Sequence, residues 1–399
     1  MSEDPWLTII GVGEDGPDGL STASRAALES AEIIMGPPRH LALLPYATAT
    51  RIAWPVPFSE GIERLLDLRG RRVAVLASGD PFWFGAGTVL ATRLSVGEWR
   101  ALPGRSTFSL AAAQLGWGLE TTICLGLHAA PLSRLRPHLS PGQRIIALLR
   151  DGQAVRDLAA YLRMQGFGTS ALTVMQALGG PAQAVIRALA DTLPDRDFGH
   201  PVCVAIHVAG DGASLPLASG RDDTWFDHDG QITKRPIRAL TLSALAPRAG
   251  QHLWDIGGGS GSVAIEWLMS DPSLRATSIE PRPDRADRIA ANAARLGMDR
   301  LHVVTGHAPA VLRDLDRPDA VFIGGGLSDP LLDWLGTHLP PGTRIVANAV
   351  TLESEAMLTQ THIRLGGDLL RIEMAVATPI GSRRGWKASY PITQWSHVL

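Results

Sequence analysis

The sequence predicts an α/β protein made of more than one domain, and three observations support this. At 399 residues the chain exceeds the roughly 250 to 300 residues at which a single hydrophobic core stops growing. Short apolar runs rich in β-branched residues predict strands, as at residues 6–13, 72–78 and 144–149. Segments of helical period, such as Ser21–Ala31, lie between such runs. This alternation is typical of α/β domains.

Composition and charge exclude several classes of protein. Hydrophobic residues make up 45% of the chain and charged residues 19%, and no apolar run reaches the roughly 18 residues of a membrane span, so neither a disordered nor a membrane protein is expected. With 37 basic against 39 acidic residues, the chain offers nucleic acid no basic surface. Residues 1–5 contain no basic residue and the next apolar run is too short for a signal peptide, so we expect a cytoplasmic protein.

The two cysteines, Cys124 and Cys203, are each isolated between apolar neighbours. This pattern indicates neither a disulfide framework nor a metal site. Both are predicted to be buried, reduced thiols.

A connector is predicted around residues 210–223, which are rich in small residues, Gly and Pro and show no amphipathic period. The domain boundary is placed there, between residues 1–212 and residues 213–399. The glycine signatures of one half do not recur at matching offsets in the other. The two halves therefore look like a fusion rather than a duplication.

Three glycine turns follow predicted strands in the first half. Gly11 and Gly13 end the first strand, Ser78–Pro81 end a later one, and Pro103–Thr107 precede the predicted helix Phe108–Leu115. Each turn alone could be an ordinary connection between a strand and a helix. Because their strands are expected in one sheet, the three turns are expected at one edge of it.

The second half predicts a Rossmann-like unit. It opens with a helix over Lys234–Leu245, and residues 252–261 predict a strand that runs into a glycine turn. A helix at Ser262–Met269 and a strand at 276–281 follow. The helix predicted over 285–297 ends in a glycine, a common helix terminator.

The glycine turn of this half carries the pattern D-x-G-x-G-x-G over residues 255–261. Its position between a strand and a helix exposes backbone amides to a ligand. Glu280 comes nineteen residues later, at the end of the next strand, where a carboxylate can accept both hydroxyls of a ribose. The leading Asp255 disfavours a pyrophosphate and suits an ammonium group. The pattern resembles motif I of the Rossmann-type S-adenosylmethionine methyltransferases, which implies that the cofactor is bound by Asp255, Gly257, Gly259, Gly261 and Glu280.

Two later segments bear on this resemblance. Residues 303–309 place His307 where such methyltransferases usually carry an acid that meets the adenine amino group, so a backbone contact from Ala308 is expected instead. The predicted strand 319–326 ends in three glycines, where DNA and RNA amino-methyltransferases usually carry an Asn-Pro-Pro-Tyr type motif. Methylation of a nucleic acid base is therefore disfavoured.

The three turns of the first half together resemble the loops of the tetrapyrrole (corrin/porphyrin) methylase fold, which binds S-adenosylmethionine between two α/β lobes. Segments 175–183 and 202–208 fit the second lobe of that fold. The resemblance implies lobes at about 1–120 and 121–212 and a second S-adenosylmethionine site. The residues expected to bind this cofactor are Gly11, Gly13, Ser78, Gly79, Asp80, Pro81, Ser106 and Thr107.

Over its whole length the chain resembles the precorrin-6Y C5,15-methyltransferase family in its fused, two-domain form. Residues 226–267 resemble the start of that family's methyltransferase and decarboxylase domain, and RPDAVFIGGGLSDP, RIVANAVTLESEA and PITQW extend the match to the C-terminus. The resemblance implies that the N-terminal domain methylates carbon 5 of a precorrin. It also implies that the C-terminal domain methylates carbon 15 and removes carbon dioxide from the carbon 12 acetate, so that each domain uses one S-adenosylmethionine.

An acidic tetrapyrrole is expected to meet guanidinium and ammonium groups. The candidates to bind its carboxylates, each of which could equally be solvated, are Lys234, Arg235, Arg238, Arg383, Arg384 and Lys387. A base that takes a ring proton could be Asp80 or Asp15, in loops expected to face the N-terminal cleft, and each could equally be a turn or cap acid. In the second domain the candidates are His228, Asp229 and Asn348, with a turn or a loop hydrogen bond as the alternative for each.

The expected partner is thus a small tetrapyrrole, without nucleic acid, membrane or metal, and the chain is expected to form a homo-oligomer. Two alternatives stay open: an RNA methyltransferase, because the tetrapyrrole methylase fold also serves that task, and a non-catalytic carrier of a corrinoid precursor. The near-neutral charge disfavours the first, and the intact pattern from Asp255 to Glu280 disfavours the second.

Overall fold

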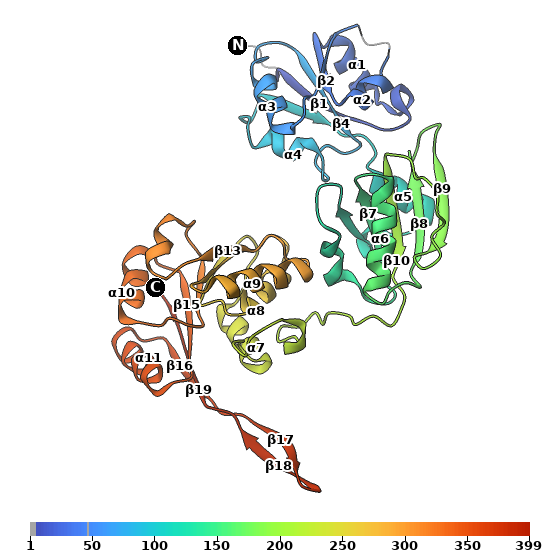
Figure 1. Ribbon diagram of the computed structural model, residues 1–399. Coiled ribbons are helices and arrows are strands. Elements are labelled where there is room, and N and C mark those ends of the chain that lie inside the picture. Colours follow the sequence, from blue (N-terminus) through green and yellow to red (C-terminus); the bar gives the residue numbers. More distant parts are fainter. Residues whose placement is uncertain (1–4, 46–47) are drawn as a thin grey trace. The chain divides into compact units, whose positions relative to one another are not determined.

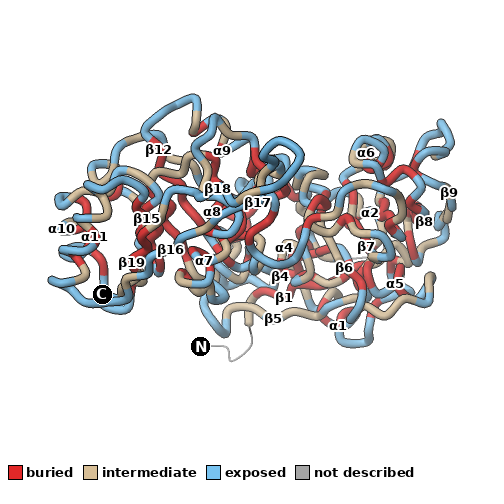
Figure 2. The backbone as a smooth tube through the Cα atoms, turned by 90° about the horizontal axis from the view of Figure 1, so that it is seen from below, coloured by how far each residue is buried: buried red, intermediate tan, exposed pale blue. Residues whose placement is uncertain are grey.

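The computed structural model describes residues 5–45 and 48–399, and the chain divides into two compact units (Figure 1). The first unit consists of Met1–Leu132 and His138–Ser214, and the second of Ser133–Pro137 and Leu215–Leu399. Residues 1–4 of the segment examined for a signal peptide lie outside the described residues. Buried residues are concentrated in the strands of the main sheets (Figure 2).

A five-stranded parallel sheet forms the first lobe of the first unit, in the order β3-β2-β4-β1-β5. Its strands are β1 (Leu7–Val12), β2 (Ile33–Gly36), β3 (Thr50–Ala53), β4 (Val73–Ser78) and β5 (Trp99–Leu102). Its helices are the 3-10 helix η1 (Gly16–Gly19), α1 (Thr22–Ser30), α2 (Pro38–Leu43), α3 (Phe58–Leu66) and α4 (Ala86–Ala91). Strand β1 is buried along its whole length, which explains why its sequence is continuously apolar rather than alternating.

A second five-stranded sheet, in the order β6-β7-β10-β8-β9, forms the second lobe, and only its β6–β7 pairing is parallel. Its strands are β6 (Ile123–Gly126), β7 (Arg144–Leu149), β8 (Ala171–Gln176), β9 (Ala184–Leu189) and β10 (Val202–His207). The helices are α5 (Thr107–Leu115), η2 (Leu119–Thr121) and α6 (Gly152–Met164), and the 3-10 helix η3 (Leu132–His138) belongs mostly to the second unit. Ser106 begins α5 by accepting a hydrogen bond from the Ser109 amide at 3.0 Å, which satisfies one free donor of the first turn.

The second unit is built on a seven-stranded sheet in the order β13-β12-β11-β14-β15-β19-β16. Its strands are β11 (His252–Ile256), β12 (Arg275–Glu280), β13 (His302–Thr305), β14 (Ala320–Ile323), β15 (Arg344–Ala349), β16 (Asp368–Ile372) and β19 (Ile392–Val398). Its helices are η4 (Asp223–Trp225), α7 (Arg235–Leu245), α8 (Ser262–Ser270), α9 (Pro283–Arg295), η5 (Ala310–Asp314), α10 (Asp329–His338) and α11 (Leu352–Leu365).

The parallel part of this sheet confirms the predicted Rossmann-like unit. Strand β11 pairs in parallel with β12 on one side and with β14 on the other. The strand order therefore reverses at the carboxyl end of β11, the switch point where α/β sheets bind ligands. Strands β19 and β16 extend the sheet by antiparallel pairing beyond β15.

An antiparallel hairpin, β17 (Ala375–Ile380) and β18 (Arg383–Ala388), projects from the second unit beyond the ends of β16 and β19 (Figure 1). The sequence analysis did not predict it. Most of its side chains are exposed, and they include Trp386 at 78% and Val376 at 61%.

The described residues contain no membrane-spanning helix, no candidate metal-binding group and no disulfide. Among them no helix is both long and apolar enough to cross a bilayer. The same residues contain no group of three His, Cys, Asp or Glu side chains placed to hold a metal ion. Cys124 and Cys203 are free thiols, and burial raises the pKa of Cys203 to about 12. That thiol therefore stays protonated and unreactive at neutral pH.

Candidate cofactor and substrate sites

The three glycine turns of the first unit meet at the carboxyl ends of β1, β4 and β5. The Gly79 amide donates to the Val12 carbonyl at 3.0 Å, and the Gly104 amide donates to the Gly79 carbonyl at 2.9 Å. A Cβ atom on Gly11 would lie only 1.8 Å from the Gly79 carbonyl oxygen. The turns thus pack backbone against backbone, and only glycine fits at Gly11.

A cavity of about 330 Å³ opens beside these turns. Both lobes of the first unit line it, since His128 and Met175 from the second lobe face the turns of the first. The lining includes the predicted cofactor residues Gly13, Ser78, Gly79, Asp80, Ser106 and Thr107. Gly11 and Pro81 do not line the cavity. Gly11 instead allows the backbones of Gly79 and Gly104 to pack closely against it.

The two candidate bases of the first unit differ in position. Asp80 lines the cavity, and its Oδ1 accepts a hydrogen bond from the Phe82 amide at 2.9 Å. Asp15 does not line the cavity, and its carboxylate pairs with the guanidinium of Arg105. Asp15 therefore supports the loop that carries Arg105, and the geometry favours Asp80 over Asp15 for contact with substrate.

A polar cluster that the sequence analysis missed lies on the same cavity wall. Buried His40 is the acceptor for Arg39, with 2.7 Å between its Nε2 and Arg39 Nη2, and the Ser78 hydroxyl lies 2.9 Å from the same nitrogen. Glu14 pairs with the Arg39 guanidinium. Burial, followed by the charge of Arg39, lowers the pKa of His40 to about 4, so the ring is neutral and can accept. The sequence offered one signal for this cluster, because Arg39 and His40 come shortly after β2, at the carboxyl end where the glycine turns also lie.

The glycine loop of the second unit connects β11 to α8 at the switch point of the sheet. Gly257, Gly259 and Gly261 have φ values of +74°, +60° and +74°, a region that residues with a Cβ rarely adopt. A Cβ on Gly257 would also lie 2.6 Å from the Gly325 amide nitrogen. The predicted need for glycine at these positions is therefore conformational and steric.

Glu280 lies at the end of β12, where the sequence placed it, and is 2% exposed. Its Oε2 accepts from the Gly259 amide at 2.9 Å, and its Oε1 accepts from the Arg282 amide at 3.2 Å. Each oxygen keeps a second lone pair for a ligand hydroxyl. Together with His307 and Ala308, Glu280 lines a cavity of about 410 Å³ above the glycine loop.

Asp255 does not occupy the position that the sequence analysis expected. Its side chain is 1% exposed, lies outside the cavity lining and accepts a hydrogen bond from the Ala264 amide at 3.3 Å. Successive side chains of a strand point to opposite faces, which turns this carboxyl towards helix α8. This geometry does not favour the expected contact with a cofactor ammonium group, and the hydrogen bond from the Ala264 amide ties Asp255 to the first turn of α8.

Asp255→Asn tests this structural role through its pH dependence. Burial, reinforced by the charge of Glu280, raises the pKa of Asp255 from 3.8 to about 7. Between these values the folded state holds a proton that the unfolded chain has released, so the free energy of unfolding falls as the pH rises through this window. The Asn variant is expected to melt at a higher temperature than the wild type above pH 7 and to lose that pH slope. Thermal unfolding of the second unit at several pH values measures both, and parallel curves for the two proteins would contradict the role.

The cavity extends from the glycine loop to a wall formed by Phe322, Asn348 and Ile392. Asn348 Nδ2 donates to Thr241 Oγ1 at 2.9 Å, and Gln394 Nε2 donates to Asn348 Oδ1 at 2.9 Å. Thr241 and Gln394 are buried. The amide of Asn348 is therefore held in one orientation at the cavity surface, at a point away from the glycine loop.

The His228 and Asp229 pair does not face this cavity. Asp229 pairs with Arg285 at 2.8 Å and with Arg288 at 3.4 Å, and the Arg285 hydrogen bond in particular lowers the pKa of the Asp229 carboxyl. His228 Nδ1 accepts from the Gly230 amide at 3.0 Å. Neither side chain lines the cavity, so the turn that the sequence analysis weighed as the alternative describes them better than catalysis does.

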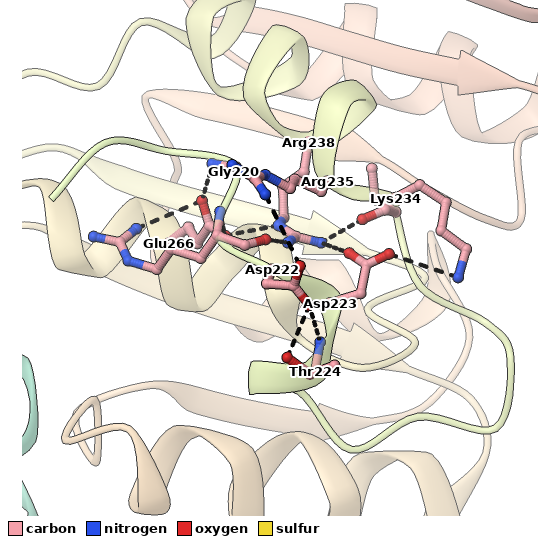
Figure 3. Close-up of polar contacts among 10 residues, drawn as sticks. Gly220, Asp222, Asp223, Thr224, Lys234, Arg235, Arg238 and Glu266 are labelled. Atoms are coloured by element: carbon pink, nitrogen blue, oxygen red, sulfur yellow. Dashed lines mark hydrogen bonds and ion pairs between the residues drawn. The ribbon is translucent and has the colours of Figure 1, made fainter. Parts of the chain in front are cut away.

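The six basic residues that are candidates to bind substrate carboxylates lie in different environments in the structure. Lys234 lines the cavity and also lies 3.7 Å from Asp223, and Arg235 lies outside the cavity lining, 3.9 Å from Asp222. Arg383, Arg384 and Lys387 lie on the projecting hairpin and do not line the cavity. Arg238 is a correction, because it is fully buried between Glu266 and Asp223 and cannot reach a substrate (Figure 3).

Both units match known families of proteins. Residues 6–194 match the family model described as tetrapyrrole (corrin/porphyrin) methylases, and residues 224–399 match that of the precorrin methyltransferase domain. A protein of Sinorhizobium sp named precorrin-6Y C(5,15)-methyltransferase (decarboxylating) is 50% identical over 397 residues, covering 98% of this chain and 96% of that protein. The protein of the same name from Mycobacterium tuberculosis (strain CDC 1551 / Oshkosh) is 39% identical over 398 residues, covering 98% and 99%. Among solved structures, the C-terminal domain of precorrin-6Y C5,15-methyltransferase from Rhodobacter capsulatus is 57% identical, covering 46% of this chain and 100% of that chain with a TM-score of 0.45.

Proposed function

This chain belongs to the family of decarboxylating precorrin-6Y C(5,15)-methyltransferases, and on that premise we propose which of its sites carries each step. It is an S-adenosylmethionine-dependent methyltransferase of cobalamin biosynthesis that methylates a precorrin at two ring carbons and removes one carboxyl group. The RNA methyltransferase and carrier alternatives gain no support, because relatives matching 98% of the chain bear the name of this enzyme.

Each methyl transfer depends mainly on the alignment of the ring carbon with the methyl group of the cofactor. In each methyl transfer a ring carbon attacks the methyl group of the sulfonium, the carbon–sulfur bond breaks to give neutral S-adenosylhomocysteine, and the ring releases one proton. Charge is lost rather than created at sulfur, so positioning, worth about 7 to 11 kcal/mol in well-oriented systems, is the larger contribution. In the decarboxylation the electron pair of the broken carbon–carbon bond enters the conjugated macrocycle, which then takes up a proton.

The first unit is assigned methylation at carbon 5, and the second unit methylation at carbon 15 with decarboxylation. The observation that carries the use of one site in each unit is that each unit contains its own cavity beside glycine turns, of about 330 Å³ and about 410 Å³. The carbon assigned to each unit follows from the family that its sequence resembles. Each cavity is also lined by residues outside its glycine turns. These include the aromatic Trp83 and Phe84 in the first cavity and the polar Lys234 and Asn348 in the second. One cofactor and one face of the substrate can thus meet in each unit.

Roles are assigned residue by residue on the same geometry. In the first unit the turn residues hold the cofactor and Asp80 meets the substrate. In the second unit Glu280 accepts the ribose hydroxyls, and the backbone around His307 and Ala308 faces the adenine. Lys234 pairs with a substrate carboxylate, and Asn348 contacts the ring that is methylated.

Mass spectrometry of the product tests the proposal. Incubation with a reduced precorrin-6 intermediate and S-adenosylmethionine is expected to add two methyl groups and remove one carbon dioxide. Calorimetry with S-adenosylhomocysteine on the full chain is expected to show two binding sites. A product with one added methyl group, or a single binding site, would contradict the assignment of one site to each unit.

We also propose that the chain forms a homo-oligomer through the β17–β18 hairpin. The hairpin exposes apolar side chains on both of its faces, Val376 and Ile380 on one and Trp386 on the other, at 61%, 65% and 78%, and a second copy of the chain could cover them. Light scattering of the full chain is expected to give a multiple of its 42.5 kDa mass. Replacement of residues 375–388 by a short glycine turn should reduce that multiple, and an unchanged mass would contradict the proposed surface.

A further inference from the structure

A segment without helix or strand covers the cofactor loop of the second unit. This segment, residues 227–234, connects η4 to α7 and is called the strap below. Its residues Gln231–Lys234 line the cavity, and the Gln231 carbonyl oxygen lies 3.2 Å from the position of a Cβ on Gly259. The strap has no ladder of its own hydrogen bonds, so contacts with its neighbours must fix its course.

The first of these contacts is made by Arg238 of α7, which also forms a buried ion pair with Glu266 of α8. Both side chains are fully buried, and Arg238 Nε donates to Glu266 Oε1 at 2.8 Å (Figure 3). The Glu266 carboxylate also accepts from the Gly220 amide at 2.6 Å and the Arg221 amide at 3.0 Å. Glu266 thus joins the connector to the helix that begins at the glycine loop.

The remaining nitrogens of Arg238 point to the strap and to the turn before it. Nη1 donates to the Thr233 carbonyl at 2.5 Å and to Asp223 Oδ1 at 3.1 Å, and Nη2 donates to the Arg221 carbonyl. The guanidinium also lies 4.8 Å from the centre of the Phe226 ring. One planar group therefore holds both the segment before the strap and the end of the strap that lines the cavity.

A second contact fixes the other end of the strap. Asn292, which is 1% exposed, accepts from the Asp227 amide at 2.9 Å and donates to the Asp227 carbonyl at 2.9 Å. The same Nδ2 lies 3.0 Å from the Ser260 carbonyl oxygen, within the glycine loop. The strap is therefore tied to the loop at its start and to α8, through Arg238, at its end.

Stability alone does not account for this pair. Two fully buried charges lose their hydration, and replacing such a pair by apolar residues of similar volume is often neutral or stabilising. An apolar replacement would, however, leave the carbonyl groups of Thr233 and Arg221 without their donor. The hydrogen bond from Arg238 to the Thr233 carbonyl fixes the end of the strap, which an apolar side chain could not do.

We propose that Arg238 and Glu266 are positioning residues of the second methyl transfer, which hold the strap over the cofactor and so set cofactor affinity. This inference rests on the proposed function of the second unit. It also explains why the arginine that the sequence presented as a carboxylate ligand is withdrawn from the cavity.

The test separates positioning from folding in the full chain. The double variant Arg238→Met with Glu266→Leu removes both charges together, which costs less stability than leaving one buried charge of the pair unpaired. It also leaves the Arg221 guanidinium and the amides of Gly220 and Arg221 without the Glu266 carboxylate, so the second unit is expected to melt below the wild type, and the KM is measured below that melting temperature. The KM for S-adenosylmethionine in the second methylation, followed by product mass, is expected to rise by about tenfold or more, because the strap residues Gln231–Lys234 that line the cavity would be misplaced. The kcat at saturating cofactor should change much less than this KM, and the first methylation should not change.

Two further variants keep the test decisive. Arg238→Lys retains the charge beside Glu266 but cannot donate to two carbonyls in the fixed geometry of a guanidinium. It should fold and raise the KM, so it provides the test if the double variant does not fold. Arg344→Met is the matched control, because Arg344 donates to the Leu245 carbonyl at 2.8 Å and to Gln251 at 2.6 Å, at the opposite end of α7. It should lower stability without changing the KM.

An unchanged KM in both Arg238 variants would overturn the inference. So would a KM increase in the Arg344 control equal to that of the Arg238 variants. Failure of the wild-type chain to perform a second methylation would instead refute the proposed function, which keeps the two failures distinguishable.

Discussion

Gly11→Ala is expected to abolish methylation by the first unit while the second unit remains active. The added Cβ would lie 1.8 Å from the Gly79 carbonyl oxygen and 2.3 Å from the Gly104 amide nitrogen, so the three turns that form the cofactor wall must separate. Because misplacement by about 1 Å can cost about 100-fold in rate, we expect the first methylation to fall by at least about 100-fold. The product should then carry one new methyl group, which mass spectrometry will place.

The control for this substitution is Gly336→Ala. Gly336 lies within α10, no atom would meet its Cβ within 4 Å, and its φ is not positive, so alanine is expected to leave both reactions unchanged. Retention of two methyl groups at the wild-type rate in Gly11→Ala would mean that the first unit does not bind its cofactor against these turns. Complete loss of both methyl groups would mean that the two steps are not independent.

The sequence predicted the parts of this fold that follow from local physics. Largely apolar runs placed β1 and β4, because strands buried on both faces are mostly apolar. Strand β11 contains the buried polar residues His252 and Asp255, and the glycine turn that follows it marked its end. The glycines of the loop at 257–261 were identified because their positive φ values exclude other residues. Such constraints act within a few residues and are visible without a fold.

The parts that were missed depend on partners distant in the sequence. The hairpin β17–β18 presents exposed, mixed side chains, so no hydrophobic period marks it. The sequence showed Arg238 as a basic residue near a ligand-binding segment, but its place is decided by Glu266, 28 residues away. The direction of the Asp255 side chain was equally invisible, because it depends on which face of β11 the helix α8 covers.

The cluster around Arg39 and His40 shows the same limit in the first unit. Neither residue belongs to a recognisable motif, and only the fold brings Glu14, Arg39 and Ser78 together around the buried ring. The motif-based assignments were most useful where a backbone conformation carries the function. They were least useful where the function of a charged side chain depends on the partner that neutralises it.

Glu280→Ala is expected to have the largest effect on the second unit. The buried carboxylate organises the loop through Gly259 and Arg282, and in the proposed site it also accepts the two ribose hydroxyls. Loss of hydrogen bonds to a charged group costs about 1.5 to 3 kcal/mol each, so removal of both ribose contacts should reduce kcat/KM for the second methylation by about 100-fold or more. Decarboxylation should decline with it, whereas the first methylation should persist.

Asp284→Asn provides the matched control for this change. Asp284 is exposed, lies in the first turn of α9 four residues after Glu280 and pairs with Arg282 at 2.8 Å, so its charge can be removed without touching the cavity, and the expected rate is that of the wild type. Product mass and S-adenosylhomocysteine calorimetry on both variants separate the outcomes. If Glu280→Ala binds two molecules of S-adenosylhomocysteine with wild-type affinity, Glu280 does not hold the ribose, and the cofactor must lie elsewhere along the cavity. If only the site of the second unit is lost, Glu280 at the end of β12 and the glycine loop after β11 act together on one cofactor, as the hydrogen bond from the Gly259 amide to Glu280 already indicates.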